Sequence, residues 1–229
     1  MIVCIVSGAS SGIGEAIALE LQRRGVTVIN ASRKRNEKIS YNYQIDLCNE
    51  DEIKNFANWV EDRFDRLDCL VNNAGVMLLK NLYEYSLEDY NNVMNTNLRA
   101  CYLMCREFIP LLLKGDGKII NIASISGTLA CPDDPIYGVS KAGLISLTKS
   151  LAVKYAGKLA VNCISPGYIS GTKLIHGGGP TPKELVERIP IKREGTPEEV
   201  AKVVADMLEW SKYITGVNLQ IDGGLSCCE

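Results

Sequence analysis

The stretch IVCIVSGASSGIGEAIALELQRRG, residues 2–25, decides the fold of this 229-residue chain. Ile2 to Val6 is a short, entirely apolar run, which is typical of a strand covered on both faces. A glycine-rich turn follows, and apolar residues then recur at helical spacing until Gly25, a natural helix C-terminal cap. This strand, turn and helix predict the first unit of a parallel α/β sheet.

The glycine-rich turn suits the pyrophosphate of a dinucleotide. Gly8, Gly12 and Gly14 let the backbone approach a ligand closely, and the start of the helix offers unpaired N–H groups at the positive end of its dipole. Their spacing is G-x-x-x-G-x-G rather than the G-x-G-x-x-G fingerprint. An ordinary tight connection between strand and helix is therefore an alternative for this turn.

The second predicted strand, 26–31, ends in a basic run, Ser32-Arg33-Lys34-Arg35. In dinucleotide folds an acidic side chain near this point binds the adenosine ribose, whereas an arginine accommodates a 2′-phosphate. No acidic residue occurs here before Glu37. The run favours NADP over NAD, with a solvated basic loop as the alternative. A third strand at 41–45 follows so closely that little room is left for a crossover helix.

Further elements alternate along the chain as a doubly wound α/β fold requires. Apolar runs predict strands at 67–71, 118–123, 159–165 and 219–221. Capping patterns predict helices over 49–63, 86–113 and 196–210. Polar residues at 95–97 should interrupt the second of these helices, and Asn97 could turn inward to hold water. We expect one domain over residues 1–229.

A second stretch, NIASISGTLACPDDPIYGVSK at residues 121–141, carries the candidate chemistry. Tyr137 and Lys141 stand four residues apart in a helical pattern, so both side chains should project from one helix face about one turn apart. Ser124 follows the apolar run 118–123. Its hydroxyl should lie at the carboxyl end of the sheet, where open parallel sheets bind their ligands.

A tyrosine hydroxyl has an ordinary pKa of ~10 and is a poor acid or base at neutral pH. An ammonium held ~5 Å away favours the phenolate and should lower that pKa by about two units. Such a pair suits general acid–base catalysis. Taken alone, Tyr137 and Lys141 could instead be an amphipathic surface pair, and Ser124 a plain hydroxyl at a strand end.

Composition excludes several classes of protein. A formal net charge of −2 and a pI near 5.6 give no electrostatic reason for binding nucleic acid or an anionic membrane. No apolar run approaches the ~20 residues of a membrane-spanning helix, and the chain opens without a basic leader, so we expect a cytoplasmic protein. Nine scattered cysteines without a C-x-x-C pair and a single histidine predict free thiols and no metal site.

The segment 170–182 is rich in Gly, Thr and Pro and contains His176. Long irregular segments of this kind often close over an active site, so 170–190 is predicted to be a substrate lid. A disordered surface loop is the alternative. No internal repeat, low-complexity tract or domain linker is visible.

Taken in order, these motifs resemble those of the short-chain dehydrogenase/reductase family along essentially the whole chain. They are Ser7-Gly8-x-x-x-Gly12-Ile13-Gly14, Asn72-Asn73-Ala74-Gly75, Asn97, Ser124, Tyr137-x-x-x-Lys141, Pro166-Gly167 and Asp222-Gly223-Gly224. The resemblance implies a single Rossmann-like doubly wound sheet of seven parallel strands with helices on both faces. It also implies NAD(P)-dependent interconversion of an alcohol and a ketone, usually by a tetramer or dimer.

The resemblance assigns catalytic roles to four residues. Tyr137 would donate a proton to the carbonyl oxygen, and Ser124 would polarise that oxygen through a hydrogen bond. Lys141 would lower the Tyr137 pKa and bind the nicotinamide ribose. Asn97 would hold a water in the proton relay behind Lys141.

It also implies where the cofactor binds. The glycines would line the pyrophosphate, Asp46 would meet the adenine, Asn73 the adenosine-side ribose region, and Ile169 the carboxamide. The full predicted set is Gly8, Ser10, Ser11, Gly12, Ile13, Gly14, Ser32, Arg33, Asp46, Leu47, Asn73, Ala74, Gly75, Tyr137, Lys141, Pro166, Gly167, Ile169 and Thr172.

Two positions depart from the family pattern. Ser7 stands where the family usually has Thr, which keeps the hydroxyl. Thr172 comes one residue later than the expected carboxamide-binding Thr, which puts that role in doubt.

The sequence therefore favours an NADP-dependent carbonyl reductase or alcohol dehydrogenase, similar to 3-oxoacyl-thioester reductases and to polyol or sugar dehydrogenases. A catalytically silent dinucleotide-binding sensor is the alternative. The helical region containing Ala100, Cys101, Leu103, Met104, Cys105 and Phe108 has more apolar surface than one sheet face needs, which predicts a homo-oligomer, tetramer or dimer.

Overall fold

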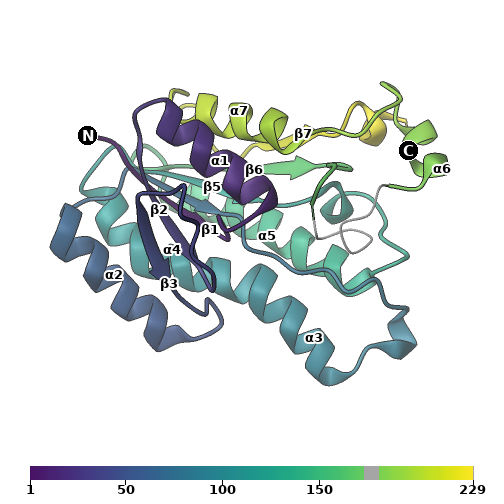
Figure 1. The fold of residues 1–229 in the computed structure, drawn as a ribbon, viewed down its shortest axis with the longest axis horizontal. Coiled ribbons are helices and arrows are strands. Elements are labelled where there is room, and N and C mark those ends of the chain that lie inside the picture. Colours follow the sequence, from purple (N-terminus) through teal and green to yellow (C-terminus); the bar gives the residue numbers. More distant parts are fainter. Residues whose placement is uncertain (173–180, 229) are drawn as a thin grey trace.

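The computed structural model describes residues 1–172 and 181–228, and its centre is one sheet of seven parallel strands in the order β3-β2-β1-β4-β5-β6-β7 (Figure 1). The seven-stranded parallel sheet expected from the sequence is thus confirmed. The strands are β1 (Val3–Ser7), β2 (Thr27–Ser32), β3 (Tyr41–Gln44), β4 (Cys69–Asn72), β5 (Lys118–Ile122), β6 (Ala160–Pro166) and β7 (Asn218–Ile221).

Helices cover both faces of this sheet. In Figure 1, α1 (Gly12–Arg23) and α7 (Pro197–Met207) lie along one face, and α2 (Glu50–Phe64), α4 (Ala100–Leu113) and α5 (Pro135–Lys154) lie along the other. Two shorter helices, α3 (Leu87–Met94) and α6 (Lys183–Arg188), lie away from the sheet. One apolar core fills each side, because the inner strands carry side chains that are buried in both directions.

Strand β1 shows why the central strands are apolar throughout. It pairs with β2 on one side and β4 on the other, with Ile5 beside Ile29 and Leu70, and every residue of β1 is buried. Burying one such side chain contributes roughly 1.5 to 3 kcal/mol. The strand order reverses between β1 and β4, so the loops after these two strands diverge and leave room for a ligand at their carboxyl ends.

The predicted helix starts are confirmed. Ser86 and Asp89 form a capping box at α3, and Thr196 and Glu199 form one at α7, with Pro197 at the first helical position. The Asn49 side chain accepts hydrogen bonds from two backbone N–H groups at the start of α2. Helix α7 ends at Met207, a little before the predicted residue 210.

The predicted interruption near residues 95–97 is a short π-helical segment, Asn95–Arg99, between α3 and α4. The wider turn of a π-helix lets one side chain depart from the regular helical faces. Here the side chain is that of Asn97, which is fully buried. The polar residues therefore mark a local change in helix geometry that turns Asn97 inward.

The connection between β2 and β3 contains no helix, as its length predicted, and three asparagines organise it instead. The Asn42 Oδ1 atom accepts hydrogen bonds from Asn30 Nδ2 at 2.8 Å and from the Asn36 backbone N–H at 2.9 Å. Asn42 Nδ2 in turn donates to the carbonyl oxygens of Asn36 and Ile39. This asparagine network supplies the hydrogen bonds that a crossover helix would otherwise make internally.

The apolar residues of α4 are not the surplus surface that the sequence suggested. Ala100, Cys101, Leu103, Met104, Cys105 and Phe108 are all buried in the core beneath the sheet. The exposed apolar side chains of α4 are instead Tyr102 and Leu113, and those of α5 are Val139 and Val153. The expected reason for an oligomer was therefore wrong, because α4 packs its apolar face within its own subunit.

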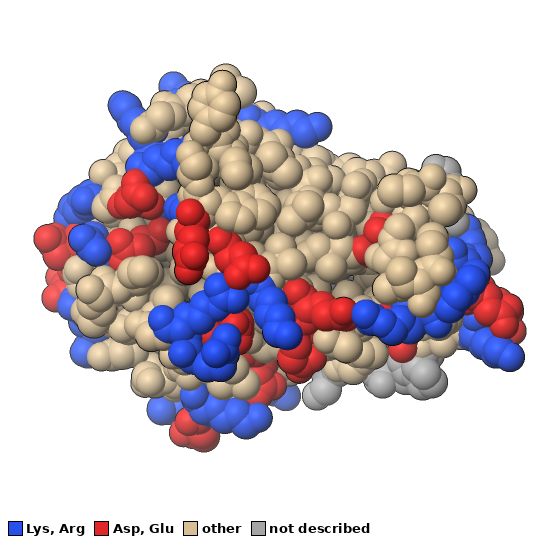
Figure 2. Space-filling view, turned by 90° about the horizontal axis from the view of Figure 1, so that it is seen from above, with Lys and Arg blue, Asp and Glu red and all other residues tan. Residues whose placement is uncertain are grey.

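Charged side chains of both signs are interspersed on the face seen in Figure 2. Arg24, which caps the C-terminus of α1, pairs for example with Asp206 on α7 at 2.7 Å and with Glu20 at 2.9 Å. Exposed pairs of this kind add little stability. Within residues 1–172 and 181–228, the structure contains no helix with the length and apolar character needed to cross a membrane.

Candidate active site

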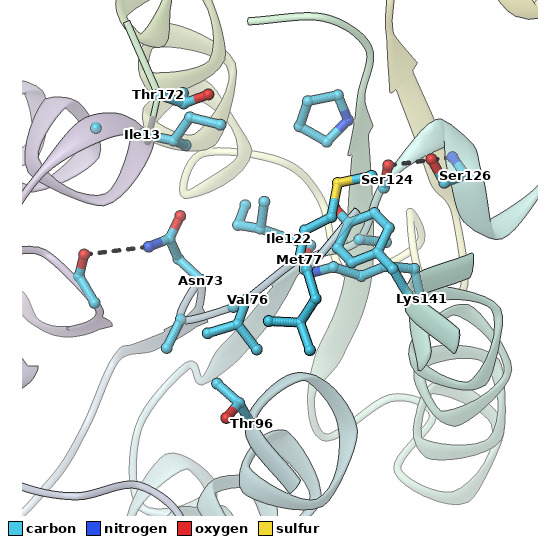
Figure 3. A pocket seen from close by; sticks show the side chains of 18 of the residues that line it. Ile13, Asn73, Val76, Met77, Thr96, Ile122, Ser124, Ser126, Lys141 and Thr172 are labelled. Carbon is cyan, nitrogen blue, oxygen red and sulfur yellow. Dashed lines mark hydrogen bonds between the residues drawn. The ribbon is translucent and has the colours of Figure 1, made fainter. Parts of the chain in front are cut away.

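One large cavity, of about 1690 Å³, opens at the carboxyl ends of the strands. It runs from the glycine turn after β1 to the loops that follow β4, β5 and β6. Of all the residues predicted to be catalytic or cofactor-binding, only Asn97 does not border it. The structure thus brings together residues from positions 8 to 172 that are scattered along the sequence. Figure 3 shows Ile13, Asn73, Ser124, Lys141 and Thr172 around this hollow.

The glycine turn forms an open backbone cradle at one part of the cavity. Gly8 and Gly12 have φ angles of +68° and +59°, which residues with a side chain rarely adopt. A Cβ atom on Gly14 would lie 2.4 Å from Asn73 Nδ2, whereas one on Gly12 would meet nothing nearer than 3.9 Å. Gly14 therefore allows close packing of the turn against β4, and Gly12 leaves the backbone accessible from the cavity.

The hydroxyl of Ser7 locks this turn to the loop after β4. Its Oγ atom accepts hydrogen bonds from the backbone N–H groups of Asn73 at 2.8 Å and Ala74 at 3.0 Å. The Asn73 side chain donates to the Ser7 carbonyl oxygen at 2.9 Å. Serine at position 7 thus uses its hydroxyl to join the two loops. Asn73 borders the cavity while its amide holds the glycine turn in place.

The basic run after β2 lines one end of the cavity. Ser32 is buried and its hydroxyl donates to the Lys34 carbonyl oxygen at 2.6 Å, which bends the chain so that Arg33 and Lys34 both border the cavity. Lys34 was not among the predicted site residues, although it stands next to Arg33. Asn36 donates to the Ala9 carbonyl oxygen, so the asparagine network also contacts the glycine turn.

At the other end, β5 and α5 place the three candidate catalytic side chains. Helix α5 begins at Asp134, whose carboxylate accepts from the Tyr137 N–H at 3.1 Å, and Pro135 fills the first helical position. A 3-10 turn at Ile125–Gly127 packs so tightly on α5 that a Cβ on Gly127 would lie 2.8 Å from the Lys141 carbonyl carbon. This contact holds Ser124, at the end of β5, against the helix that carries Tyr137.

Lys141 is buried, and its ammonium has few partners. Nζ donates to the Ile122 carbonyl oxygen at 2.8 Å and lies 5.7 Å from the centre of the Tyr137 ring. Burial lowers the pKa of Lys141 to about 8, because the charged form loses its hydration. The ammonium is therefore retained at neutral pH beside the phenol, at a cost to stability.

The pKa of Tyr137 was predicted wrongly from the sequence. Instead of a value lowered by Lys141, burial raises the pKa of Tyr137 to about 12, with Ser124 opposing the shift through a hydrogen bond. The reason is that Tyr137 is only 4% exposed, so the phenolate would lose its hydration. The phenol of Tyr137 therefore keeps its proton at neutral pH.

Asn97 lies behind the cavity and is held by protein groups. Its Oδ1 atom accepts from the Val76 N–H at 2.8 Å, and its Nδ2 donates to the Val76 carbonyl and to Ser140 Oγ. The backbone carbonyl of Asn97 accepts from the Cys101 thiol at 3.3 Å. Asn97 therefore joins the loop after β4 to helix α5, close to Lys141.

The loop after β6 closes another side of the cavity. Gly167 packs against Asp222, where a Cβ would lie 2.8 Å from the Asp222 Cβ, and Ile169 is buried next to Gly195. Thr172 donates its hydroxyl proton to the Ile169 carbonyl at 3.1 Å, and its methyl group lies 3.9 Å from where a Cβ on Gly12 would stand. Thr172 thus lines the cavity even though it comes one residue late.

The wall of the cavity next to Ser124 and Tyr137 is formed by four loops and a short helix. Part of it comes from residues 128–135 and 170–190, where the sequence places the substrate pocket; these residues are Leu129, Ala130, Cys131, Pro132, Asp133, Leu185 and Arg188. Sequence reasoning missed the others, which are Met77, Leu78, Leu79, Ser126, Tyr168 and Leu225. No motif marks these six residues, since their position depends on loop conformation. Part of the predicted lid, residues 173–180 with His176, lies outside the described residues, and helix α6 lies within its described remainder, 170–172 and 181–190.

Comparisons with known proteins agree with this geometry. A family model described as "Enoyl-(Acyl carrier protein) reductase" matches residues 8–226. The 3-oxoacyl-[acyl-carrier-protein] reductase FabG of Thermotoga maritima is 33% identical over 238 residues, which cover 97% of each chain. The FabG of Rickettsia bellii is 36% identical over 231 residues, covering 96% of this chain and 95% of its own.

Solved structures show the same architecture. The ligand-free aldohexose dehydrogenase of Thermoplasma acidophilum superposes with a TM-score of 0.92 at 31% sequence identity, covering 99% of this chain and 94% of that one. A short chain dehydrogenase from Bacillus anthracis superposes with a TM-score of 0.89 at 27% identity, covering 98% and 96% of the two chains.

Proposed function

The chain belongs to the short-chain dehydrogenase/reductase family, whose members act on CH–OH groups with NAD(P), and we propose that it interconverts a ketone and a secondary alcohol with NADP(H). The proposal places the cofactor and the reaction in the one cavity described above, within a single domain spanning residues 1–229. The observation that carries it is the meeting of Ser124, Tyr137 and Lys141 at one end of a cavity whose other end is the glycine cradle.

The cavity fits a dinucleotide cofactor. The backbone of Gly12 is accessible, the first turn of α1 points its N–H groups toward the cradle, and Ser10, Ser11 and Ile13 border the same space. When bound, the nicotinamide supplies or accepts the hydride. Gly167, Ile169 and Thr172 would hold the nicotinamide end, and Asp46 and Leu47 the adenine end.

Tyr137 would donate the proton to the substrate oxygen. A phenol with a raised pKa keeps its proton at neutral pH, and it faces Ser124, whose hydroxyl would orient and polarise the same oxygen. In the protein without cofactor, Tyr137 thus already carries the proton that carbonyl reduction consumes. This protonation state favours reduction over alcohol oxidation. Alcohol oxidation would need the phenolate and is expected to speed up as the pH rises.

Lys141 would bind the nicotinamide ribose and hold positive charge next to the phenol. Its single described hydrogen bond, to Ile122, leaves further ammonium donors directed toward the cavity that it borders. A buried ammonium is a strong donor to ribose hydroxyls because little water competes for it. Asn97 would hold a water behind Lys141 and so connect the site to solvent.

NADP is the proposed cofactor because of the basic turn after β2. Arg33 and Lys34 both border the adenosine end of the cavity, while the Ser32 side chain offers a hydroxyl where many NAD-dependent enzymes offer a carboxylate. A 2′-phosphate carries nearly two negative charges and forms strong charge-assisted hydrogen bonds with such groups.

Two substrate classes stay open, and the relatives' names span both of them. They are 3-oxoacyl thioesters, as in the FabG relatives, and sugars, as in the aldohexose dehydrogenase. The test is a panel of 3-oxoacyl thioesters, simple ketones, aldoses and polyols, assayed with each cofactor by the absorbance of the reduced nicotinamide. Turnover of one class identifies the substrate, whereas binding of NADPH without turnover of any of them would indicate the silent sensor.

We also propose a homo-oligomer, a tetramer or dimer, formed through the outer faces of α4 and α5. The exposed apolar residues there are Tyr102, Leu113, Val139 and Val153. Light scattering at micromolar concentration is expected to show more than one subunit, and replacing Val139 and Val153 by Glu is expected to give monomers. A monomeric unmodified protein would contradict this part of the proposal.

A further inference from the structure

Asp134 is a fully buried carboxylate just outside the cavity. Four donors converge on its two oxygens. Oδ2 accepts from the backbone N–H groups of Leu78 at 2.9 Å and Leu79 at 3.1 Å. Oδ1 accepts from the N–H of Tyr137 at 3.1 Å and from the hydroxyl of Tyr85. This pattern leaves the carboxyl group acting only as an acceptor, as an ionised side chain does.

A buried charge without a cation requires an explanation. Lys80, which follows Leu79 in the chain, pairs with Asp89 at 2.8 Å instead, and among the described residues no Lys or Arg forms an ion pair with Asp134. Removing a carboxylate from water is costly, so its hydrogen bonds must replace the lost hydration. A helix cap alone would need only one of the four, and serine or asparagine would supply it without a charge.

The other hydrogen bonds reach the wall of the cavity. Leu78 and Leu79 line the cavity beside the candidate catalytic residues, and Leu79 has a φ of +52°, a strained value for leucine. The bonds to Asp134 hold the chain in this conformation. Tyr85 adds a third segment, the turn that leads into α3. Two neighbouring segments after β4 and the start of α5, about fifty residues later, therefore meet at one carboxylate.

We propose that Asp134 is a positioning residue that joins the Leu78–Leu79 wall of the substrate cavity to the catalytic Tyr137, so that substrate and proton donor are held in one fixed geometry. The connection is short, because the same carboxylate that binds the wall also accepts from the Tyr137 backbone. A displacement of about 1 Å between substrate and acid can lower a rate by roughly 100-fold. A shared anchor prevents such displacement.

The charge of Asp134 also acts on the phenol. Its negative charge raises the pKa of Tyr137, after burial and in the same direction as Cys131, while Ser124 opposes the shift. The Lys141 ammonium also faces Tyr137, with its Nζ atom 5.7 Å from the centre of the ring. Asp134 therefore helps to keep Tyr137 protonated, which is the state that reduction of a carbonyl requires.

This inference rests on the proposed function for its catalytic part, and Asp134→Ser separates it from simple helix capping. Serine can still cap α5 but cannot bind Leu78, Leu79 and Tyr85. We expect Asp134→Ser to lower kcat/KM by about tenfold or more, with most of the loss in kcat. Tyr85→Phe, which keeps the carboxylate, should cost less. If Asp134→Ser has unmodified kinetics, Asp134 is only a cap and the proposal fails.

The pH profile provides a readout that a purely structural role would not move. In Asp134→Ser and Asp134→Asn the charge is gone, so the limb of the kcat/KM profile due to Tyr137 should shift to lower pH. Thr196→Ala removes the cap of α7 far from the substrate wall and is the matched control. It should lose a similar amount of stability with an unshifted profile. An unshifted limb in both Asp134 variants would overturn the electrostatic part.

Backbone amide exchange tests the anchor without any substrate. In the unmodified protein the amides of Leu78, Leu79 and Tyr137 should be protected, and in Asp134→Ser those of Leu78 and Leu79 should exchange at least about tenfold faster while Tyr137 stays protected. If no substrate of the panel is turned over, this measurement still decides whether the anchor exists. Equal exchange at Leu78 and Leu79 in both proteins would overturn it.

Discussion

The two ends of the cavity hold their charged groups in opposite ways. At the catalytic end Tyr137 and Lys141 are 4% and 3% exposed, and they stand on a regular helix. At the adenosine end Arg33 and Lys34 are exposed on an irregular turn. Burial changes what a group does chemically, whereas exposure leaves its charge unaltered and available to a phosphate. Proton transfer calls for the first arrangement and recognition of an anion for the second.

The supports of the two ends differ as well. The catalytic end is anchored by an ionised carboxylate, Asp134, and by helix packing around Gly127. The adenosine end is held by the neutral asparagine network of Asn30, Asn36 and Asn42. Because the asparagines are neutral, they do not compensate the positive charges of the basic turn. Those charges stay available to bind a phosphate. Variants at the two ends should therefore differ both in which property they change and in the size of the effect.

The largest effect is expected from Tyr137→Phe, which removes only the proton donor. Turnover should fall by about 100-fold or more, because general acid catalysis is worth at least that much. Cofactor affinity, measured by NADPH fluorescence, should change little. Tyr213→Phe, at a side chain that is 98% exposed, is the control. If Tyr137→Phe kept more than about a tenth of the activity, another acid would have to serve.

Lys141→Met should stabilise the fold while lowering both turnover and cofactor affinity. Burial lowers the pKa of Lys141 from its usual 10.5 to about 8, which corresponds to a cost on the order of 3 kcal/mol in the protonated form. Loss of the hydrogen bond to Ile122 should reduce the gain. Urea unfolding at pH 7 measures this gain in the free energy of unfolding. The control is Lys154→Met, since Lys154 is an exposed lysine on the same helix.

The pH dependence of that gain tests its cause. Between pH 8 and 10.5 the unfolded chain binds a proton at Lys141 that the folded protein does not, so the stability of the unmodified protein rises with pH across this window. The advantage of Lys141→Met should be complete below pH 8 and should vanish near 10.5. If the stability difference between Lys141→Met and the unmodified protein stayed constant over this pH range, it would come from side-chain shape and not from charge.

At the adenosine end, changing Ser32 to Asp together with Arg33 to Ser should reverse a preference for NADP of about tenfold in kcat/KM. The added carboxylate repels the 2′-phosphate and accepts hydrogen bonds from ribose hydroxyls. Arg35→Ser is the matched control, since Arg35 is exposed and pairs with Glu37 at 3.6 Å. An unmodified enzyme that favours NAD would contradict the assignment of the basic turn.

The smallest effect is expected from Asn42→Ala, which removes the centre of the asparagine network. Stability should fall by about 1 kcal/mol, because buried backbone groups of Asn36 and Ile39 lose a partner. The basic turn should loosen, so the affinity for NADP should fall more than that for NAD. Asn58→Ala on the exposed face of α2 is the control. Unchanged cofactor affinities would show that the turn does not depend on the network.

The sequence by itself determined the strands, the helix starts and the positions that carry the candidate chemistry. Apolar runs predicted the buried strands, and hydroxyl or amide caps predicted where α2, α3 and α7 begin. These signals are local, since hydrogen bonding at a helix end and burial of a strand depend on residues only a few positions apart. The glycine turn and the Tyr137–Lys141 spacing could be recognised in the sequence because they too are local patterns.

The tertiary structure alone decided the properties that depend on distant residues. The pKa of Tyr137 rises because the fold dehydrates it, an effect that the spacing to Lys141 could not reveal. The apolar residues of α4 turned out to be core because α2 and the sheet cover them. Asp134 was not among the residues that the sequence singled out. Its bonds to Leu78 and Leu79 span more than fifty residues and exist only once the chain has folded.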